Sequence, residues 1–416
     1  MERFALSRMK EWKENENRKP LIIRGARQVG KTWIMKTFGQ QYFEKTAYVN
    51  FDNNARMKQV FEGDLDIERL VLSISAETGV SIEAENTLII FDEVQEVPKA
   101  LTSLKYFYEN APQYAIVAAG SLLGVALHQG TSFPVGKVDF LDLYPLNFRE
   151  FLCAMGEKQF VSMLDSCDTQ MVTVFKTKYI ERLREYYFVG GMPEVVKDFS
   201  EKKDYNRVRA IQKNLINYYQ QDFSKHAEIK LVPRLNLVWN SIPMQLAKEN
   251  KKYIYGQVRE GSRAKDFELA IQWLLDCGLI HKVQRIQKPD LPLKAYIDFD
   301  AFKLFLVDIG LLIAMTDLDA KVIIEGNKIF TEFKGALTEQ YILQQLISDV
   351  GVIPYYYSTQ NSKGEIDFLV QGKTSVIPIE VKAEENLKAK SLKAFCEKYQ
   401  PSYAVRTSMS DYREQD

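Results

Sequence analysis

The stretch that decides the fold of the amino-terminal part reads Leu21-Ile22-Ile23-Arg24-Gly25-Ala26-Arg27-Gln28-Val29-Gly30-Lys31-Thr32. Its first four residues predict a buried strand, and its last eight match the pattern G-x-x-x-x-G-K-[ST] at the start of a helix. Glycines let backbone N–H groups converge on phosphate oxygens, and the amino terminus of the helix adds partial positive charge. The stretch therefore predicts a phosphate-binding loop, and a plain glycine turn is the alternative.

Two side chains of this loop are candidates for nucleotide chemistry. We expect Lys31 to bridge the β- and γ-phosphates and Thr32 to offer its hydroxyl to Mg²⁺. The loop itself does not separate ATP from GTP, but the sequence holds no N-K-x-D-like segment that would read guanine. ATP with Mg²⁺ is thus the predicted cofactor, bound by the residues Gly25, Ala26, Arg27, Gln28, Val29, Gly30, Lys31 and Thr32.

A second apolar strand, at residues 88–91, ends in two acids, Asp92 and Glu93. We expect Asp92 to hold Mg²⁺ and Glu93 to orient and polarise the attacking water, a pair of roles that suits a hydrolase. Another explanation is that the two acids only cap a buried strand.

The first third of the chain predicts an α/β fold. Short apolar runs alternate there with longer mixed segments, which is typical of a buried parallel sheet with helical crossovers. The predicted strands are LIIR (21–24), AYVNF (47–51), LIIF (88–91) and AIVAA (115–119). After the last strand, Ser121 could sense the γ-phosphate or merely cap the next helix. Lys137 and Arg149 lie where a cation from a neighbouring subunit could act, although charges there are usually solvated.

Length and composition limit the remaining possibilities. The chain has 416 residues, which suggests about three domains, and its 46% hydrophobic residues exclude a collagen-like, mucin-like or wholly disordered chain. The 55 basic and 55 acidic residues cancel, so nucleic-acid binding would need local basic patches. The first 20 residues lack an unbroken apolar stretch, and we expect a cytoplasmic protein with no membrane partner.

Four domains are predicted from the order of helical and strand patterns. They are an AAA-type P-loop ATPase core (1–150), a helical lid and connector (151–228), a winged-helix-like domain (229–330) and an α+β nuclease-like domain of the restriction-endonuclease type (331–416).

In the last of these domains, a set of charged residues resembles the PD-(D/E)xK nuclease pattern. Glu339 lies on a predicted helix, Asp367 on a strand, and Glu380 and Lys382 on the next strand, where residues two apart share a face. We expect Glu339, Asp367 and Glu380 to bind Mg²⁺. In this interpretation Lys382 positions a water or steadies the charge of the transition state, so that Asp367, Glu380 and Lys382 are the candidate catalytic residues. The alternative is a set of structural ion pairs on a half-buried sheet.

Several motifs together resemble the prokaryotic AAA-type ATPase family that carries a carboxy-terminal domain of uncharacterised function. They are GARQVGKT, LIIFDEVQEVP, AAGSLLG, FPVGKVDFLDLYPLNFREF, YYFVGGMPEVV, WLLDCGLI and KLFLVDIGLL. The resemblance covers nearly the whole chain and implies ATP binding and an AAA-type lid. A homo-oligomer is one assembly state that we consider for the chain. Many relatives have Gly-Arg where this chain has Gly136-Lys137, so a conventional arginine finger at this position is not expected.

The predicted function is Mg²⁺-dependent ATP hydrolysis that controls a carboxy-terminal module for handling DNA or another nucleic acid, with nuclease activity as a further hypothesis. Basic residues on predicted helices, Arg263, Lys265, Lys388, Lys390 and Lys393, could contact phosphates or could simply be solvated. The alternative function is a nucleotide-dependent switch or interaction protein whose nuclease-like domain has lost cleavage and docks a partner.

Overall fold

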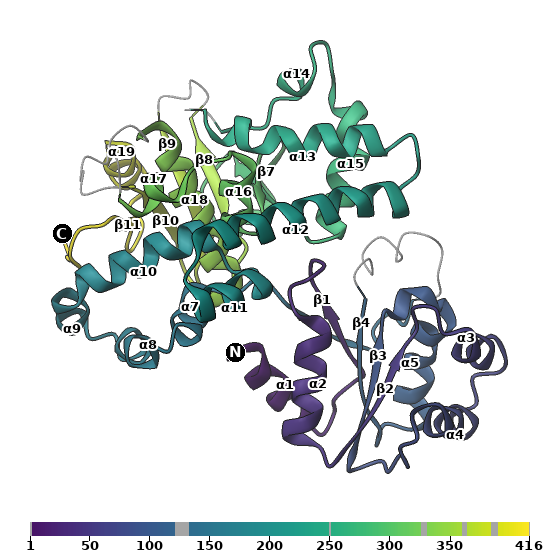
Figure 1. Ribbon diagram of the computed structural model, residues 1–416. Coiled ribbons are helices and arrows are strands. Elements are labelled where there is room, and N and C mark those ends of the chain that lie inside the picture. The colour runs from purple at the N-terminus through teal and green to yellow at the C-terminus, as the bar shows by residue number, and fades with distance from the viewer. Residues whose placement is uncertain are drawn as a thin grey trace. The chain divides into compact units, whose positions relative to one another are not determined.

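The computed structural model describes residues 2–120, 133–248, 251–325, 331–359, 364–383 and 390–415, apart from the side chains of residues 331 and 332. The chain divides into two compact units, one of residues 2–144 and 276–278 and one of residues 145–275 and 279–416. The first unit is coloured purple to blue in Figure 1, and the second teal to yellow. The main boundary between the units falls between residues 144 and 145.

A parallel five-stranded sheet forms the centre of the first unit, as the sequence predicts, with the strand order β2-β3-β4-β1-β5. Figure 1 shows α1 and α2 on one side of this sheet and α3, α4 and α5 on the other. The elements are α1 (Ala5–Glu14), β1 (Leu21–Arg24), α2 (Lys31–Tyr42), β2 (Lys45–Asn50), α3 (Ala55–Glu62), α4 (Ile67–Thr78), β3 (Thr87–Asp92), η1 (Val94–Glu96), α5 (Pro98–Asn110), β4 (Ala115–Ala119) and β5 (Asp139–Asp142).

Burial on both faces explains why these strands read as unbroken apolar runs. All six residues of β3 are buried. On one face, the rings of Phe51, Phe61 and Phe91 meet edge to face with centroids 5.4–5.7 Å apart. Because the strands are parallel, their carboxyl ends lie at one edge of the sheet, and the glycine loop after β1 and the acids at the end of β3 emerge at that edge.

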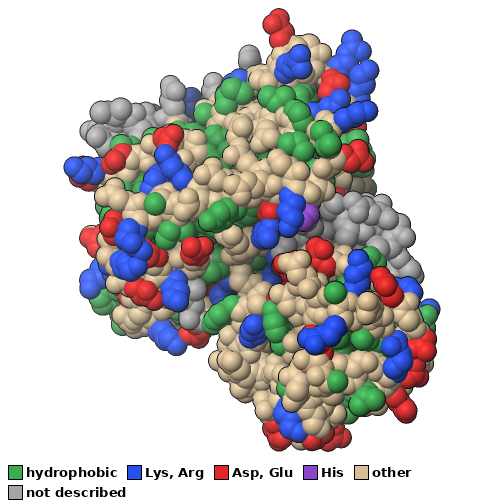
Figure 2. All heavy atoms as spheres, turned by 45° about the vertical axis from the view of Figure 1, so that its right-hand side comes forward, with side chains coloured by type: hydrophobic (Ala, Val, Ile, Leu, Met, Phe, Trp, Pro, Cys, Tyr) green, Lys and Arg blue, Asp and Glu red, His purple; other side chains and the backbone are tan. Residues whose placement is uncertain are grey.

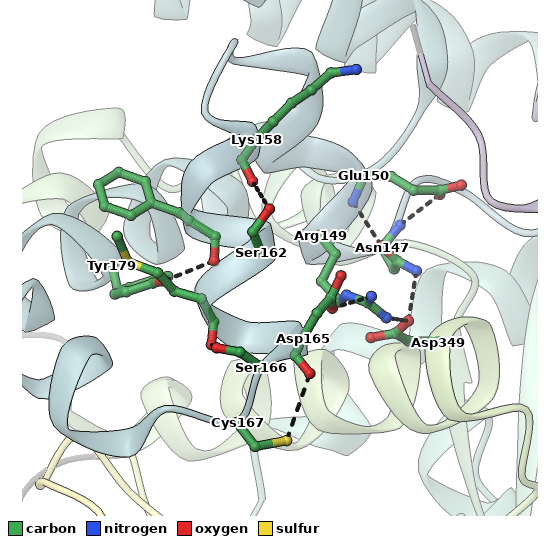
Figure 3. Close-up of polar contacts among 12 residues, drawn as sticks. Asn147, Arg149, Glu150, Lys158, Ser162, Asp165, Ser166, Cys167, Tyr179 and Asp349 are labelled. Carbon is green, nitrogen blue, oxygen red and sulfur yellow. Dashed lines mark hydrogen bonds and ion pairs between the residues drawn. The ribbon is translucent and has the colours of Figure 1, made fainter.

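The first part of the second unit is helical. Its helices are α7 (Phe148–Ala154), α8 (Lys158–Asp165), α9 (Thr169–Val174), α10 (Lys176–Val189), α11 (Pro193–Lys202), α12 (Tyr205–His226), α13 (Val232–Leu246), α14 (Tyr255–Val258) and α15 (Ala264–Asp276). Helix α7 begins with a capping box in which Asn147 and Glu150 bond each other's backbone N–H groups (Figure 3).

A six-stranded mixed sheet, with the order β11-β10-β9-β8-β6-β7, forms the rest of this unit. Its elements are β6 (Ile280–Ile286), η2 (Leu293–Tyr296), β7 (Ile297–Leu306), α16 (Ile309–Met315), α17 (Ala320–Ile324), α18 (Thr331–Gln345), the π-helical turn η4 (Leu346–Val350), β8 (Tyr355–Ser358), β9 (Glu365–Gln371), β10 (Val376–Val381), α19 (Lys390–Tyr399) and β11 (Val405–Thr407).

The predicted boundary between 330 and 331 divides this sheet. Strand β6 pairs in parallel with β8, and Ile286 and Leu293 share a core with Tyr355 and Leu369. The antiparallel hairpin of β6 and β7, which follows α15, completes the carboxy-terminal sheet. No helix of the described residues is long and apolar enough to cross a membrane.

Candidate functional site

The glycine loop takes a backbone conformation that its sequence makes accessible. Gly25, Gln28 and Gly30 have positive φ angles of 147°, 65° and 93°. A Cβ atom at Gly25 would lie 2.1 Å from the carbonyl oxygen of Leu143, so this position requires glycine. Helix α2 begins at Lys31, directly after Gly30, and its amino terminus therefore lies at the end of the loop.

Arg3 supports the loop from the start of the chain, a contact that sequence reasoning missed. Its guanidinium donates to the carbonyl oxygen of Val29 at 3.1 Å and to that of Tyr144 at 2.6 Å. Arg3 is buried. No spacing rule links residue 3 to residue 29, so only the folded chain shows that an arginine holds the loop.

Lys31 is buried and its ammonium group lies within the loop. Nζ donates to the carbonyl oxygens of Gly25 and Ala26, at 2.8 Å each. Burial lowers the pKa of Lys31 to about 8, although the nearby carboxylates of Glu93 and Asp92 act in the opposite direction. The structure thus brings Lys31 together with both predicted acids.

Thr32 and Asp92 form the pair expected of a magnesium site. Thr32 Oγ1 donates to Asp92 Oδ2 at 2.7 Å, and Tyr48 on the neighbouring strand donates its hydroxyl to the same oxygen at 2.9 Å. Burial and the charge of Asp92 raise the pKa of Tyr48. Hydroxyl and carboxylate oxygens suit Mg²⁺, so the residues present fit this ion. Tyr48 was not predicted, because a tyrosine in an apolar strand carries no distinctive signal.

Glu93 lies in a short left-handed turn, with φ 51°, directly after β3. Its Oε2 accepts a hydrogen bond from Gln95 Nε2 at 2.8 Å. A left-handed conformation is uncommon for a glutamate and places its side chain away from the course of the strand. Ser121, the predicted sensor, lies outside the described residues.

The two cations weighed for an action in trans are both engaged in ion pairs. Lys137 Nζ lies 3.0 Å from Glu109 in the first unit. In the second unit, Arg149 contacts Asp349 at 3.0 Å and also pairs with Asp165 (Figure 3). These contacts join α7 to α8 and to η4. They give Arg149 a structural role in the second unit.

The carboxy-terminal residues predicted from the nuclease pattern also come together. Glu339 is on α18, Asp367 on β9 and Glu380 on β10, and the charges of Glu339 and Glu380 both act on Asp367. Asp367 Oδ2 accepts a hydrogen bond from the backbone N–H of Val381 at 2.7 Å. Lys382 Nζ lies 2.6 Å from Glu380 Oε1.

Three further charged residues belong to this carboxylate cluster and were not predicted: Lys251, Lys303 and Glu365. Lys303 Nζ lies 2.5 Å from Glu365 and 3.5 Å from Glu339 Oε2, and Lys251 pairs with Glu339 Oε1. Glu365 could have been found, because it precedes Asp367 by two on one strand. Lys303 also leaves a signal, a single lysine within the apolar stretch of residues 301–307.

The lysines set the charge state of the cluster. Burial acts against the ionised form of Glu339, yet Lys251 and Lys303 hold its pKa below the ordinary value. Likewise, burial disfavours a charged Lys303, but Glu339, Glu365 and Asp367 raise its pKa. Burial and the charge of Glu339 raise the pKa of Asp367 well above its usual range.

The predicted Mg²⁺ site in this cluster does not fit the arrangement of the side chains. Among all described residues, no three Asp, Glu, His or Cys side chains converge closely enough to hold a metal ion. In the cluster, moreover, both oxygens of Glu339 face lysine ammonium groups. The cluster is therefore an ion-pair network as it stands.

One face of the molecule shows how charged side chains are distributed over its surface. On the face drawn in Figure 2, basic and acidic side chains are interspersed, without a continuous basic surface among the described residues. Of the predicted phosphate contacts, Lys388 lies outside the described residues, and Lys393 lies 3.9 Å from Glu397 on the same helix.

Comparison with known proteins supports the amino-terminal assignment. Residues 17–152 match the AAA domain family. Residues 180–322 match a domain of unknown function (DUF8612), and residues 334–416 match another (DUF4143). The chain thus contains an AAA-type P-loop domain, a class of domain that binds ATP, and an uncharacterised carboxy-terminal domain, which confirms these parts of the resemblance.

Solved structures show weak similarity, and no curated protein matches the chain. A Walker-type ATPase of Pyrococcus abyssi is 15% identical, with 76% of this chain and 95% of that chain covered and a TM-score of 0.47. The Orc1 protein of Aeropyrum pernix in complex with DNA is 12% identical, with coverage of 75% and 91% and a TM-score of 0.27. Similarity at this level assigns no function to the chain.

Proposed function

We propose that the AAA-type domain hydrolyses ATP with Mg²⁺ and that hydrolysis drives the carboxy-terminal unit. The 2.7 Å hydrogen bond between Thr32 and Asp92, with the buried Lys31 ammonium beside it, carries this proposal. A hydroxyl from the loop and a carboxylate from the neighbouring strand are the parts that a nucleotide hydrolase needs at one edge of its sheet.

Each residue has a separate role in this proposal. Lys31 exchanges its hydrogen bonds to the carbonyls of Gly25 and Ala26 for contacts to the terminal phosphates. Thr32 and Asp92 hold Mg²⁺, which supplies charge neutralisation at the phosphates when bound. Glu93 orients the attacking water and accepts its proton. Gly25 to Gly30 and the amino terminus of α2 cradle the phosphates.

For the second unit, we propose a cytoplasmic nucleic-acid-handling role, with residues 151–228 as lid, 229–330 as a winged-helix-like part and 331–416 as a nuclease-like part. The element order of α18, β8, β9, β10, α19 and β11 supports the last of these, because Glu339 is on a helix and Asp367 and Glu380 are on two paired strands. Assembly into a homo-oligomer belongs to the same proposal.

The second candidate function is a nucleotide-dependent docking protein whose nuclease-like part does not cleave. One observation favours it specifically: Lys251 and Lys303 neutralise Glu339, the carboxylate that the nuclease pattern assigns to a metal. An ion-pair network of this kind stabilises a fold without any need for catalysis.

A single experiment tests both candidates. Wild type, Lys31→Ala, Glu93→Gln and Lys382→Ala are compared for phosphate release from ATP and for cleavage of labelled single- and double-stranded DNA and RNA, with Mg²⁺ or Mn²⁺. Lys45→Ala, which removes an exposed lysine paired with Glu83, is the matched control. Phosphate release that needs Lys31 and Glu93 supports the ATPase. Cleavage that needs Lys382 supports the first candidate, and its absence supports the second.

A further inference from the structure

Tyr48 connects three elements at the edge of the parallel sheet where the glycine loop lies. The residue is on β2, and its hydroxyl donates to Asp92, the last residue of the neighbouring strand β3, at 2.9 Å. Its ring packs against α2, where Lys36 Nζ lies 3.7 Å from the ring centroid. Thr32 and Lys36 are one turn apart on α2, so the same side of this helix contacts Asp92 through one residue and Tyr48 through the other.

The alternation of β2 explains why Tyr48, and not a neighbouring residue, reaches this carboxylate. Ala47 and Val49 are buried on one face of the strand, and Tyr48 lies between them and points to the other face, toward α2. In the parallel register Asn50 is opposite Asp92, so Tyr48 lies two residues before that position. A long side chain with a terminal hydroxyl is therefore needed to reach the carboxylate from position 48.

Asp92 accepts hydrogen bonds from three donors. Its Oδ2 accepts from Thr32 Oγ1 at 2.7 Å and from the Tyr48 hydroxyl at 2.9 Å. Its Oδ1 accepts from the backbone N–H of Glu93 at 3.1 Å. Of these three donor residues, Tyr48 alone has no part in the proposed catalysis. Asp92 is 3% exposed, so water cannot readily replace a donor that is removed.

The hydrogen bond from Tyr48 has two opposing effects on a cation at this carboxylate. The donor withdraws negative charge from Oδ2, which weakens the attraction for a cation, but it also fixes the orientation of the carboxylate, which favours binding. In metal sites the second effect is larger, because removal of a hydrogen-bonding partner of a ligand lowers metal affinity by about 10–100-fold. The Tyr48 hydroxyl should therefore favour Mg²⁺.

We propose that Tyr48 is a positioning residue of the Mg²⁺ site, which holds the Asp92 carboxylate beside Thr32 and thereby sets the Mg²⁺ concentration at which nucleotide binds tightly. Tyr48 contacts neither Mg²⁺ nor phosphate in this arrangement. It acts through Asp92, and Lys36 holds its ring against α2. The inference rests on the proposed binding of ATP with Mg²⁺ and does not depend on hydrolysis.

The test measures how tightly the full chain binds a methylanthraniloyl-labelled, non-hydrolysable ATP analogue as the Mg²⁺ concentration is varied, with excess chelator as the Mg²⁺-free limit. Tyr48→Phe removes only the hydroxyl, and Tyr114→Phe is the matched control. Tyr114 directly precedes β4, at the edge of the sheet opposite the glycine loop, and its ring contacts Phe107. Thermal melting confirms that each variant is folded at the temperature of the measurement.

The expected result is that Tyr48→Phe needs about tenfold more Mg²⁺ than wild type for half of the gain in affinity. Its affinity in excess chelator should stay within twofold of wild type, and Tyr114→Phe should match wild type in both measurements. An unchanged Mg²⁺ requirement in Tyr48→Phe overturns the inference, and so does an equal loss of affinity with and without Mg²⁺, which is the result of a purely structural bond. Wild type that binds the analogue no better than Lys31→Ala overturns the proposed nucleotide site, and the inference with it.

Discussion

The lowered pKa of Lys31 predicts that nucleotide affinity depends on pH. With a pKa of about 8, Lys31 is mostly charged at pH 7 and mostly neutral at pH 9. Only the charged form offers a full ammonium to the phosphates, so the apparent Kd for ATP should rise about tenfold between these pH values, which is about 1.4 kcal/mol. Isothermal titration of ATP in buffers with different ionisation heats measures both the affinity and the proton taken up.

The Lys31→Ala variant is the control for this prediction. It should bind ATP more weakly at every pH, and its affinity should be flat between pH 7 and pH 9, because no titrating group remains in the loop. The nucleotide-free protein gives the opposite trend in stability. The folded pKa lies below the ordinary 10.5, so the unfolded chain binds more protons above pH 8 and the free energy of unfolding rises there with pH. An equally flat ATP affinity in wild type and variant would refute the reasoning.

Three further predictions concern residues that hold the two units in shape. Tyr48→Phe removes a hydrogen bond to the Asp92 carboxylate, and urea denaturation should show a loss of about 1.5–3 kcal/mol; no change would mean that the bond is not formed in solution. Arg3→Ala removes two hydrogen bonds from a buried guanidinium, and both unfolding free energy and ATP affinity should fall, whereas a fall in stability alone would show that the loop does not depend on Arg3. Burial raises the pKa of Asp308 to about 6, so wild-type stability should fall by about 3 kcal/mol as pH rises from about 4 to 6, and Asp308→Asn should lack this slope; a parallel slope would assign it elsewhere.

The parallel sheet and the nucleotide loop could be predicted because their signals are local. An apolar run, two glycines with a lysine between strand and helix, and a strand that ends in acids each occupy a short stretch of sequence. Strand β5 was missed, because Asp139 and Asp142 bound a short run that does not read as buried. Its place beside β1 follows from the register of the folded sheet, in which Leu21 pairs with Asp139.

The second unit was predictable only in its element types. The helix of Glu339 and the strands of Asp367 and Glu380 were identified correctly, but the lysines that neutralise Glu339 come from β7 and from the segment after α13. That contact depends on the pairing of β6 with β8, a nonlocal choice that no periodicity encodes.

The motifs GGMPEVV and KLFLVDIGLL, to which the sequence analysis assigns no chemistry, meet at a buried aspartate. Asp308 Oδ2 accepts from the backbone N–H of Gly191 at 2.6 Å, and Oδ1 accepts from Leu311 at 3.1 Å. A Cβ at Gly190 would lie 2.2 Å from Asp308 Oδ1, so a larger residue cannot stand there. Both motifs are therefore needed for the close contact between the end of α10 and the start of α16.

Helix α18 is tied to this contact by its glutamines. Gln344 donates to Asp308 Oδ2 at 3.2 Å and accepts from the backbone N–H of Ile309 at 3.0 Å, while Gln340 bonds both backbone groups of Leu306. Glu339 is the residue before Gln340 on the same helix, so its position is set by bonds to the end of β7 and the start of α16. Polar contacts have a fixed geometry. They therefore restrict the rotation of a helix about its axis, and its translation along that axis, more narrowly than apolar packing does. A change at Asp308 should therefore reach the carboxylate cluster through α18, in addition to the direct contact that Lys303, the first residue of KLFLVDIGLL, makes with Glu339.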